Sequence, residues 1–395
     1  MAETGNSSRT NVRSSGLTLR WRVRPILGAF AALLLPVTLS TWPGTAMASA
    51  AHCSVWTGVP PPSPGAVTNT LGGVTALSSC NVWAVGLYQD VADGPIVSLA
   101  EHWNGRAWTV VPTPDPDADR TLLEAVSGTS SSRVWAVGLA GDASLILLWN
   151  GTDWARVASP SPSNNGNDLS GVAAVSGADV WAVGQFASGT GAKALVLHWD
   201  GHHWARNSAP APANTSELSG VAAISARNIW AVGSFSTAST TKTLIEHWNG
   251  KKWAHVPSPN PPNPVLDVVL DGVTATSPSD VWAVGSYTSR TGDKTLIEHW
   301  NGRAWKPVAS PNPGASNDLF SVTASSATSA LAVGTYVTGA RQKTLVVRWN
   351  GRAWTRVPSP SPGQANELAS VAGNSASDIW AVGFADSQVL ATHCC

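Results

Sequence analysis

The chain has 395 residues, of which only 12% are charged, and its 24 Lys and Arg balance its 24 Asp and Glu. This balance excludes the strongly basic surface that is typical of nucleic-acid-binding proteins. Leu, Glu, Lys and Ala do not dominate any stretch, so a fold built on long helices is excluded as well. Tryptophan occurs 21 times, far more often than the three Tyr and five Phe.

Residues 1–50 have the composition of a secretory signal peptide. A start with five Arg leads into an apolar run of about sixteen residues, 25–40, and then into small residues that fit cleavage at Ala48 or Ala50. The run contains proline and is shorter than the roughly 20 residues that a bilayer-spanning helix needs. We expect a secreted, extracellular protein of residues 51–395; an uncleaved membrane anchor is the alternative.

The mature chain is slightly acidic. Residues 1–50 hold five Arg and one Glu, so 19 basic and 23 acidic residues remain after cleavage. A net charge of about −4 argues against nucleic acid and against an anionic membrane surface as partners. No later segment is apolar for long enough to span a bilayer.

Two short strings repeat through the rest of the chain, at a period of 46 to 52 residues. Trp-Ala-Val-Gly begins at Trp83, Trp135, Trp181, Trp230, Trp282 and Trp380, and a seventh copy begins with Leu331. Trp-Asn/Asp-Gly-x-x-Trp begins at Trp103, Trp149, Trp199, Trp248, Trp300 and Trp349. A Pro-rich stretch follows each copy of the second string.

Each period contains four segments with the composition of β-strands. In the third copy these are Leu169–Ser176, Asp179–Gly184, Ala194–Trp199 and His203–Arg206. Four short strands per period of about fifty residues predict the blades of a β-propeller. The absence of a 3.6-residue pattern excludes a helical solenoid, and a right-handed β-helix is the remaining alternative.

The Asn-Gly or Asp-Gly pair in each second string indicates a tight hairpin between the third and fourth strands. Such pairs favour two-residue type I′ turns, which need positive φ at both positions. We therefore expect Trp248 to pair with Lys251, and Glu246 with Trp253.

The two ends of the mature chain complete the last blade. There are seven Ala-Val-Gly copies but only six complete hairpins. Near the start, Trp56 and its Pro-rich exit match a fourth strand, and at the finish Val389–Cys394 matches a third strand. The sequence therefore predicts an all-β fold: a seven-bladed β-propeller with four antiparallel strands per blade, whose last blade is closed by the N-terminal strand of the mature chain.

The four cysteines fit this closure. Cys394 and Cys395 fall where a complete blade has its hairpin Trp and Asn, and Cys53 falls on the hairpin Gly. We expect a disulfide from Cys53 to Cys394 or Cys395 to replace the missing turn in an exported protein. Cys80 precedes the second strand of blade one and could bridge to the remaining terminal cysteine; reactive or metal-binding thiols are the alternative.

The blade resembles the kelch repeat. Val281–Gly285 stands where kelch blades have a strand ending in Gly-Gly, and His299–Trp305 stands where they have an aromatic-to-Trp hairpin. One Gly replaces the pair, and the aromatic-to-Trp interval is shorter. The resemblance to a bacterial secreted, kelch-like family implies a propeller and a binding role, and transfers no catalytic residue. Secreted kelch-type propellers also include copper radical oxidases, but their site, which uses two Tyr, two His and one Cys, is not recognisable in this sequence.

Residues present in most blades are expected to be structural. These are the His at 102, 198, 247, 299 and 393, the Glu at 101, 246 and 298, and the Asp at 179, 280 and 378. The Trp of the mature chain occupy repeated positions too, so core packing is favoured over sugar stacking. We find no motif for a catalytic site, a metal or a cofactor.

Function is expected on the loops that join the second and third strands, at residues 87–94, 234–241 and 286–292, because these vary between blades. Their Ser, Thr and Gly suit a polar, uncharged ligand or a protein. The sequence favours a monomeric, non-catalytic binding or scaffold propeller for a polysaccharide or an extracellular protein. The alternative is a secreted polysaccharide hydrolase or lyase that uses Asp90, Asp93, Glu124 or Asp142.

Overall fold

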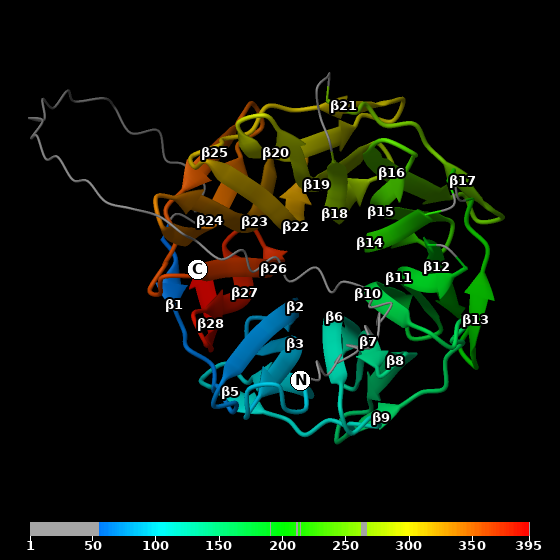
Figure 1. Ribbon diagram of the computed structural model, residues 1–395, viewed down its shortest axis with the longest axis vertical. Helices are drawn as coiled ribbons and strands as arrows, with labels where there is room; N and C mark the ends of the chain where they lie inside the picture. The colour runs from blue at the N-terminus through cyan, green and yellow to red at the C-terminus, as the bar shows by residue number, and fades with distance from the viewer. Residues whose placement is uncertain (1–54, 190, 211, 214, 262–266, 395) are drawn as a thin grey trace, which may run out of the picture.

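The structure is a computed structural model that describes residues 55–189, 191–210, 212–213, 215–261 and 267–394. The expected signal peptide with its cleavage sites at Ala48 and Ala50, together with Cys53 and Cys395, lies outside the described residues. The described part forms seven four-stranded antiparallel sheets, which surround a common axis like the blades of a propeller (Figure 1). The predicted all-β, seven-bladed propeller is confirmed. No helix in these ranges is long and apolar enough to cross a membrane.

The strands follow one another from the axis outward in each blade. Blade one contains β2 (Thr68–Ser78), β3 (Asn81–Gln89), β4 (Val97–Trp103) and β5 (Trp108–Val110). Blade two contains β6 (Thr121–Ser130), β7 (Arg133–Ala140), β8 (Ala143–Trp149) and β9 (Trp154–Arg156). Blade three contains β10 (Asn167–Ser176), β11 (Asp179–Ser188), β12 (Gly191–Trp199) and β13 (Trp204–Asn207). Blade four contains β14 (Thr215–Ser225), β15 (Asn228–Ser236), β16 (Thr241–Trp248) and β17 (Trp253–His255).

The remaining three blades have the same order. Blade five contains β18 (Val268–Ser277), β19 (Asp280–Ser289), β20 (Gly292–Trp300) and β21 (Trp305–Pro307). Blade six contains β22 (Ser316–Ser326), β23 (Ser329–Thr338), β24 (Arg341–Trp349) and β25 (Trp354–Val357). Blade seven contains β26 (Asn366–Ser375), β27 (Asp378–Ala385), β28 (Gln388–Cys394) and, from the other end of the chain, β1 (Thr57–Gly58).

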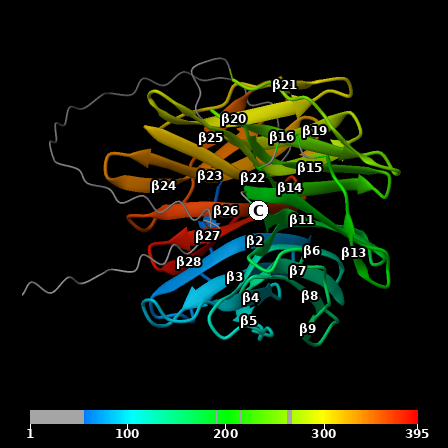
Figure 2. The ribbon, with the colours of Figure 1, turned by 45° about the vertical axis from the view of Figure 1, so that its right-hand side comes forward.

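Blade seven joins the two ends of the chain, as predicted. β1 pairs with β28 through Thr57 and His393, and the two strands lie side by side in Figure 1. β2 of blade one lies next to blade seven (Figure 2), and the Val74 amide donates to Ser370 Oγ of blade seven at 3.2 Å. Trp56, just before β1, is buried in the same cluster as Cys394. The ring therefore has no unpaired sheet edge between its first and last blades.

A β-bulge interrupts every innermost strand and explains the repeated glycine of strand two. The pairing register shifts after a buried leucine in each blade, at Leu71, Leu123, Leu169, Leu218, Leu270, Leu319 and Leu368. The bulge brings the carbonyl before that leucine over the paired glycine. A Cβ on Gly86 would collide with the Thr70 carbonyl, and the same collision recurs at Gly184 with Asp168.

Tryptophan fills the space between neighbouring blades. Trp282 of β19 is 1% exposed, and its ring lies 5.0 Å from Trp349 and 5.2 Å from Trp354, both in blade six. Its other face stacks on His299 of its own blade at 4.1 Å. The indoles thus bind each blade to the next, in agreement with the structural role expected from their spacing.

The Asn-Gly hairpins have a longer loop than the sequence suggested. Trp248 pairs with Trp253, and Glu246 with His255, so the expected pairs with Lys251 and Trp253 are wrong. Gly250 has positive φ but Asn249 does not, because the Asn249 side-chain oxygen accepts the amides of residues 251 and 252. This Asx turn produces a four-residue loop and places the two Trp directly opposite each other.

Candidate functional site

The repeated polar residues connect strands within a blade. His299 Nε2 lies 2.6 Å from Asp280 Oδ1, and the same contact measures 2.7 Å between His198 and Asp179. Each of these histidines also stacks on the Trp of strand two. The contacts recur around the ring and serve the strands themselves, so they are consistent with a structural role rather than with one asymmetric site.

The glutamates next to these histidines are buried in the blades. Glu101, Glu246 and Glu298 are each 0% exposed, and burial raises the pKa of each carboxyl to about 8. Neither carboxyl oxygen of Glu101 has a hydrogen-bond partner among the described residues. Ionisation of Glu101 near pH 8 would place an uncompensated charge inside blade one.

Replacing Glu101 by glutamine is expected to stabilise the protein at alkaline but not at acidic pH. Folding raises the carboxyl pKa from about 4.5 to about 8, so the folded state binds the proton more tightly and wild-type stability falls as pH rises through that window. Glutamine resembles the protonated form at every pH. The gain in Tm should be small at pH 5 and should exceed about 5 °C at pH 8.5. A gain in Tm that is equal at both pH values would contradict this account.

The innermost strands surround a central channel of about 270 Å³. Each blade contributes its bulge residue and the two residues that follow it. The seven bulge residues differ widely and break the symmetry of the repeat: they are Gly72, Glu124, Ser170, Ser219, Asp271, Phe320 and Ala369. This asymmetry distinguishes the channel from the rest of the fold, where the blades repeat the same residues.

Six of the seven blades have a carboxylate near the start of the innermost strand, and two of these carboxylates, Glu124 and Asp271, line the channel. Glu124 and Asp271 occupy bulge positions, and four more acids immediately precede the buried leucines. We call the whole set the channel carboxylates: Glu124, Asp168, Glu217, Asp271, Asp318 and Glu367. All lie near the start of an innermost strand, which is the end where strand two passes into strand three.

The negative charges act on one another across neighbouring blades. Burial raises the pKa of Glu124 well above its usual range, and the charge of Asp168 raises it further, against a hydrogen bond from Ser170 and the charge of Arg120. Burial likewise raises the pKa of Glu367 to about 8, with added repulsion from Asp318 and Asp271. The site favours protons or other cations.

Asp168 is the channel carboxylate of blade three, and it is buried. It is 9% exposed, and its Oδ1 atom is buried without a hydrogen-bond partner among the described residues. Burial raises its pKa to about 6, opposed by the charge of Arg120 and reinforced by that of Glu217. The Leu169 amide hydrogen-bonds to this carboxyl and lowers its pKa, which offsets part of the effect of burial.

The carboxylates named from sequence do not form one site. Asp90 and Asp142 are exposed turn residues, and Asp90 Oδ1 accepts the Ala66 amide at 3.3 Å. Asp93 is also exposed and adopts φ 59° in the same turn as Asp90. Glu124, in contrast, lines the channel and is not a loop residue. Within the described ranges, no hydrogen bond or ion pair joins any two of the four.

The loops expected to carry function are mostly strand. β3 continues to Gln89, β15 to Ser236 and β19 to Ser289, so the connections shrink to residues 90–96, 237–240 and 290–291. The predicted loops of blades four and five were too long because strand two extends past its glycine and pairs to its end with strand three, whereas the blade-one connection keeps nearly its predicted length.

Sequence reasoning missed five of the six channel carboxylates. A signal was present, since an acid beside the repeated leucine departs from the small residues of that segment. What the repeat did not reveal was the bulge, which places Glu124 and Asp271 in the lining of the channel. In the described part of the chain, no three His, Cys, Asp or Glu side chains are placed to hold a metal ion together.

Cys80 is a free, exposed thiol, so the bridge considered for it is not formed. A Cβ on Gly105 would lie 2.9 Å from Cys80 Sγ, which shows that the thiol packs against the hairpin of its own blade rather than against blade seven. Cys394 is fully buried and pairs with Ile379, as Trp300 pairs with Val281 in blade five. A bridge from Cys53 to Cys394 or Cys395 stays a prediction.

No protein-family model and no curated protein matches the chain. Solved structures do match it. YCF48 bound to a D1 peptide is 13% identical over 87% of this chain and 100% of that one, with a TM-score of 0.57. U3-55K is 10% identical over 86% and 98%, with a TM-score of 0.55. A GH74 xyloglucanase from Xanthomonas campestris is 16% identical over 85% and 55%, with a TM-score of 0.54. At such identities the likeness shows the propeller fold alone, and the kelch resemblance stays an interpretation.

Proposed function

We propose that this protein is a secreted, non-catalytic binding propeller whose central channel receives the basic side chains of an extracellular polypeptide. The observation that carries the proposal is that Glu124 and Asp271 line the channel, while further acids at the start of the neighbouring innermost strands lie close enough for their charges to act on these two and on one another. Arg120 is the cation whose charge acts on both Glu124 and Asp168. Among the described residues that line the channel there are two acids, Glu124 and Asp271, and no Lys or Arg, which makes the lining complementary to a basic side chain.

A basic ligand suits this site better than a neutral polysaccharide. Lys and Arg supply both positive charge and N–H donors, whereas the hydroxyl groups of a neutral sugar supply hydrogen-bond donors but no positive charge. The raised pKa values of Asp168 and Glu367 mean that part of the site is protonated near neutral pH. Cation binding would displace those protons, so affinity should increase as pH rises from about 6 to about 8.

The test is a calorimetric titration with three probes of similar length: hexa-arginine, hexaglutamate and cellohexaose. We expect binding of hexa-arginine alone, with an affinity that falls as salt increases and rises from pH 6 to pH 8. Binding of cellohexaose without binding of hexa-arginine would overturn the choice of ligand.

The hydrolase or lyase expected as the alternative has one feature in its favour. Glu124 and Asp168 are neighbouring carboxyls whose pKa values are raised to different extents, which is the arrangement that acid–base catalysis uses. Release of soluble product from a cell-wall polysaccharide, lost in Asp168→Asn and retained in Asp90→Asn, would favour this enzyme over the binding propeller.

A further inference from the structure

One of the seven blade interfaces lacks two of the indoles that fill the others. Strand two has Trp in six blades but Leu331 in blade six, and the third strand of blade seven ends in Cys394 where the complete blades end in Trp. Both substitutions fall between blades six and seven. Leu331 belongs to the same buried cluster as Ile379, Cys394 and Trp56, so one outer indole is still present there.

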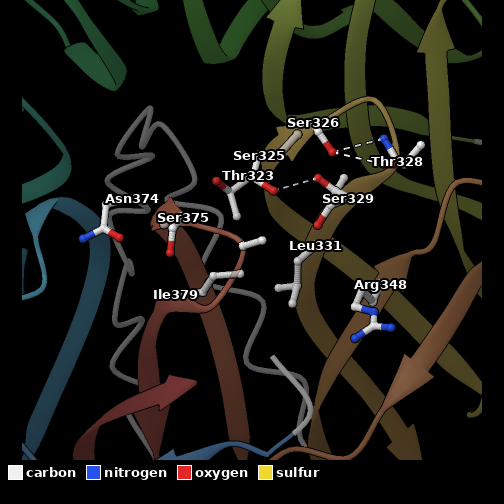
Figure 3. Close-up of a pocket in the computed structure, with 14 residues that line it drawn as sticks. Thr323, Ser325, Ser326, Thr328, Ser329, Leu331, Arg348, Asn374, Ser375 and Ile379 are labelled. Carbon is white, nitrogen blue, oxygen red and sulfur yellow. Dashed lines mark hydrogen bonds between the residues drawn. The ribbon is translucent and has the colours of Figure 1, made fainter. Parts of the chain in front are cut away.

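A cavity of about 480 Å³ occupies this position. Leu331 and Arg348, which are cross-strand neighbours in blade six, form one wall, and Ile379 of blade seven approaches from the other (Figure 3). Serine and threonine residues of the β22–β23 turn surround the opening. The volume lies in the range of small-molecule sites. The lining is mixed, with Leu331 and Ile379 as its large apolar residues and with Ser, Thr and Asn side chains around them.

The cavity also retains a hydrogen-bond acceptor that the other blades use to hold an indole. The Trp that ends strand three donates its Nε1–H to the carbonyl two residues before strand two, as Trp300 does to Pro278 and Trp349 to Ala327, at 3.2 and 3.1 Å. The corresponding carbonyl in blade seven belongs to Ala376, which lines the cavity. Cys394 has no N–H group to donate in place of the indole.

We propose that this cavity binds a small planar aromatic molecule of indole size with an N–H donor at its edge. The ring would lie between Leu331 and Ile379, where neighbouring interfaces place Trp, and its donor would face the Ala376 carbonyl. Arg348 stands in the row where other blades have a histidine stacked on Trp, directly across from Leu331, and it lines the same cavity. None of the residues that line the cavity is acidic, so cationic aromatics gain nothing from it.

The test uses 5-fluoroindole, observed by ¹⁹F NMR, with the mature protein. Ligand-efficiency limits suggest a Kd between about 10 μM and 1 mM. Leu331→Trp restores the repeat and fills the cavity, so it should weaken binding at least about tenfold. Leu331→Met conserves the volume and should keep the affinity within about threefold of wild type.

Two results would overturn the proposal: no binding of 5-fluoroindole by the wild-type protein, or equal binding by Leu331→Trp. If the tryptophan variant does not fold, wild-type crystals soaked in 5-bromoindole supply the second measurement. An anomalous bromine peak between Leu331 and Ile379 supports the site, and its absence there contradicts it.

Discussion

Replacing Trp282 by alanine is expected to lower the free energy of unfolding by about 3–5 kcal/mol. The indole is 1% exposed and lies between blades five and six, in contact with Trp349 and Trp354. Its removal leaves a cavity that the closed ring cannot collapse without moving a whole blade. Urea denaturation followed by far-ultraviolet circular dichroism measures the loss.

A matched control is available from the protein's own repeat. Trp282→Leu places in blade five the residue that blade six has naturally at position 331. It retains part of the apolar volume, so its cost should be smaller than that of alanine. If Trp282→Ala costs less than about 1 kcal/mol, the indoles do not hold the blades together as we describe.

Replacing Cys53 by serine is expected to lower the free energy of unfolding by about 4–5 kcal/mol, provided that Cys53 bridges to Cys394 or Cys395 as predicted. The structure describes only two residues of β1 as paired with β28, through Thr57 and Gly58. So short a strand leaves the closure of the ring dependent on further constraint. The bridge would close nearly the whole mature chain into one loop, for which the entropic stabilisation is large.

The Cys53→Ser variant is compared with Cys80→Ser by urea denaturation under oxidising conditions. Cys80 is a free, exposed thiol, so its replacement should change stability by less than about 0.5 kcal/mol. Added reductant should bring the wild type to the level of Cys53→Ser and leave that variant unchanged. Equal stability of the two serine variants would contradict the predicted bridge.

The repeat made the blade count, the strand order and the split seventh blade predictable. Each copy of the repeat supports the alignment of the next. The sequence match predicted Val389–Cys394 as a third strand, and the pairing of Cys394 with Ile379 of strand two confirms this prediction. The hairpin register was not predictable from Asn-Gly alone, because the turn depends on which amides the Asn249 side chain accepts.

The candidate site could not be predicted because it depends on three-dimensional closure. Glu124 and Asp271 are distant in sequence, and they line the same channel only when all seven blades close around the axis. The cavity between blades six and seven has the same origin. The repeat alone shows that Leu331 stands where other blades have Trp. The cavity that results depends also on Cys394, which reaches the same interface from the far end of the chain.

The measurement that tests the central claim most directly is the affinity for hexa-arginine after two channel carboxylates are neutralised. The double variant Glu124→Gln/Asp168→Asn keeps side-chain shape and removes two acidic groups at and beside the channel, while Glu101→Gln removes a buried acidic group elsewhere. We predict at least about tenfold weaker binding by the double variant and unchanged binding by Glu101→Gln. Unchanged affinity in the double variant would contradict a binding site at the channel.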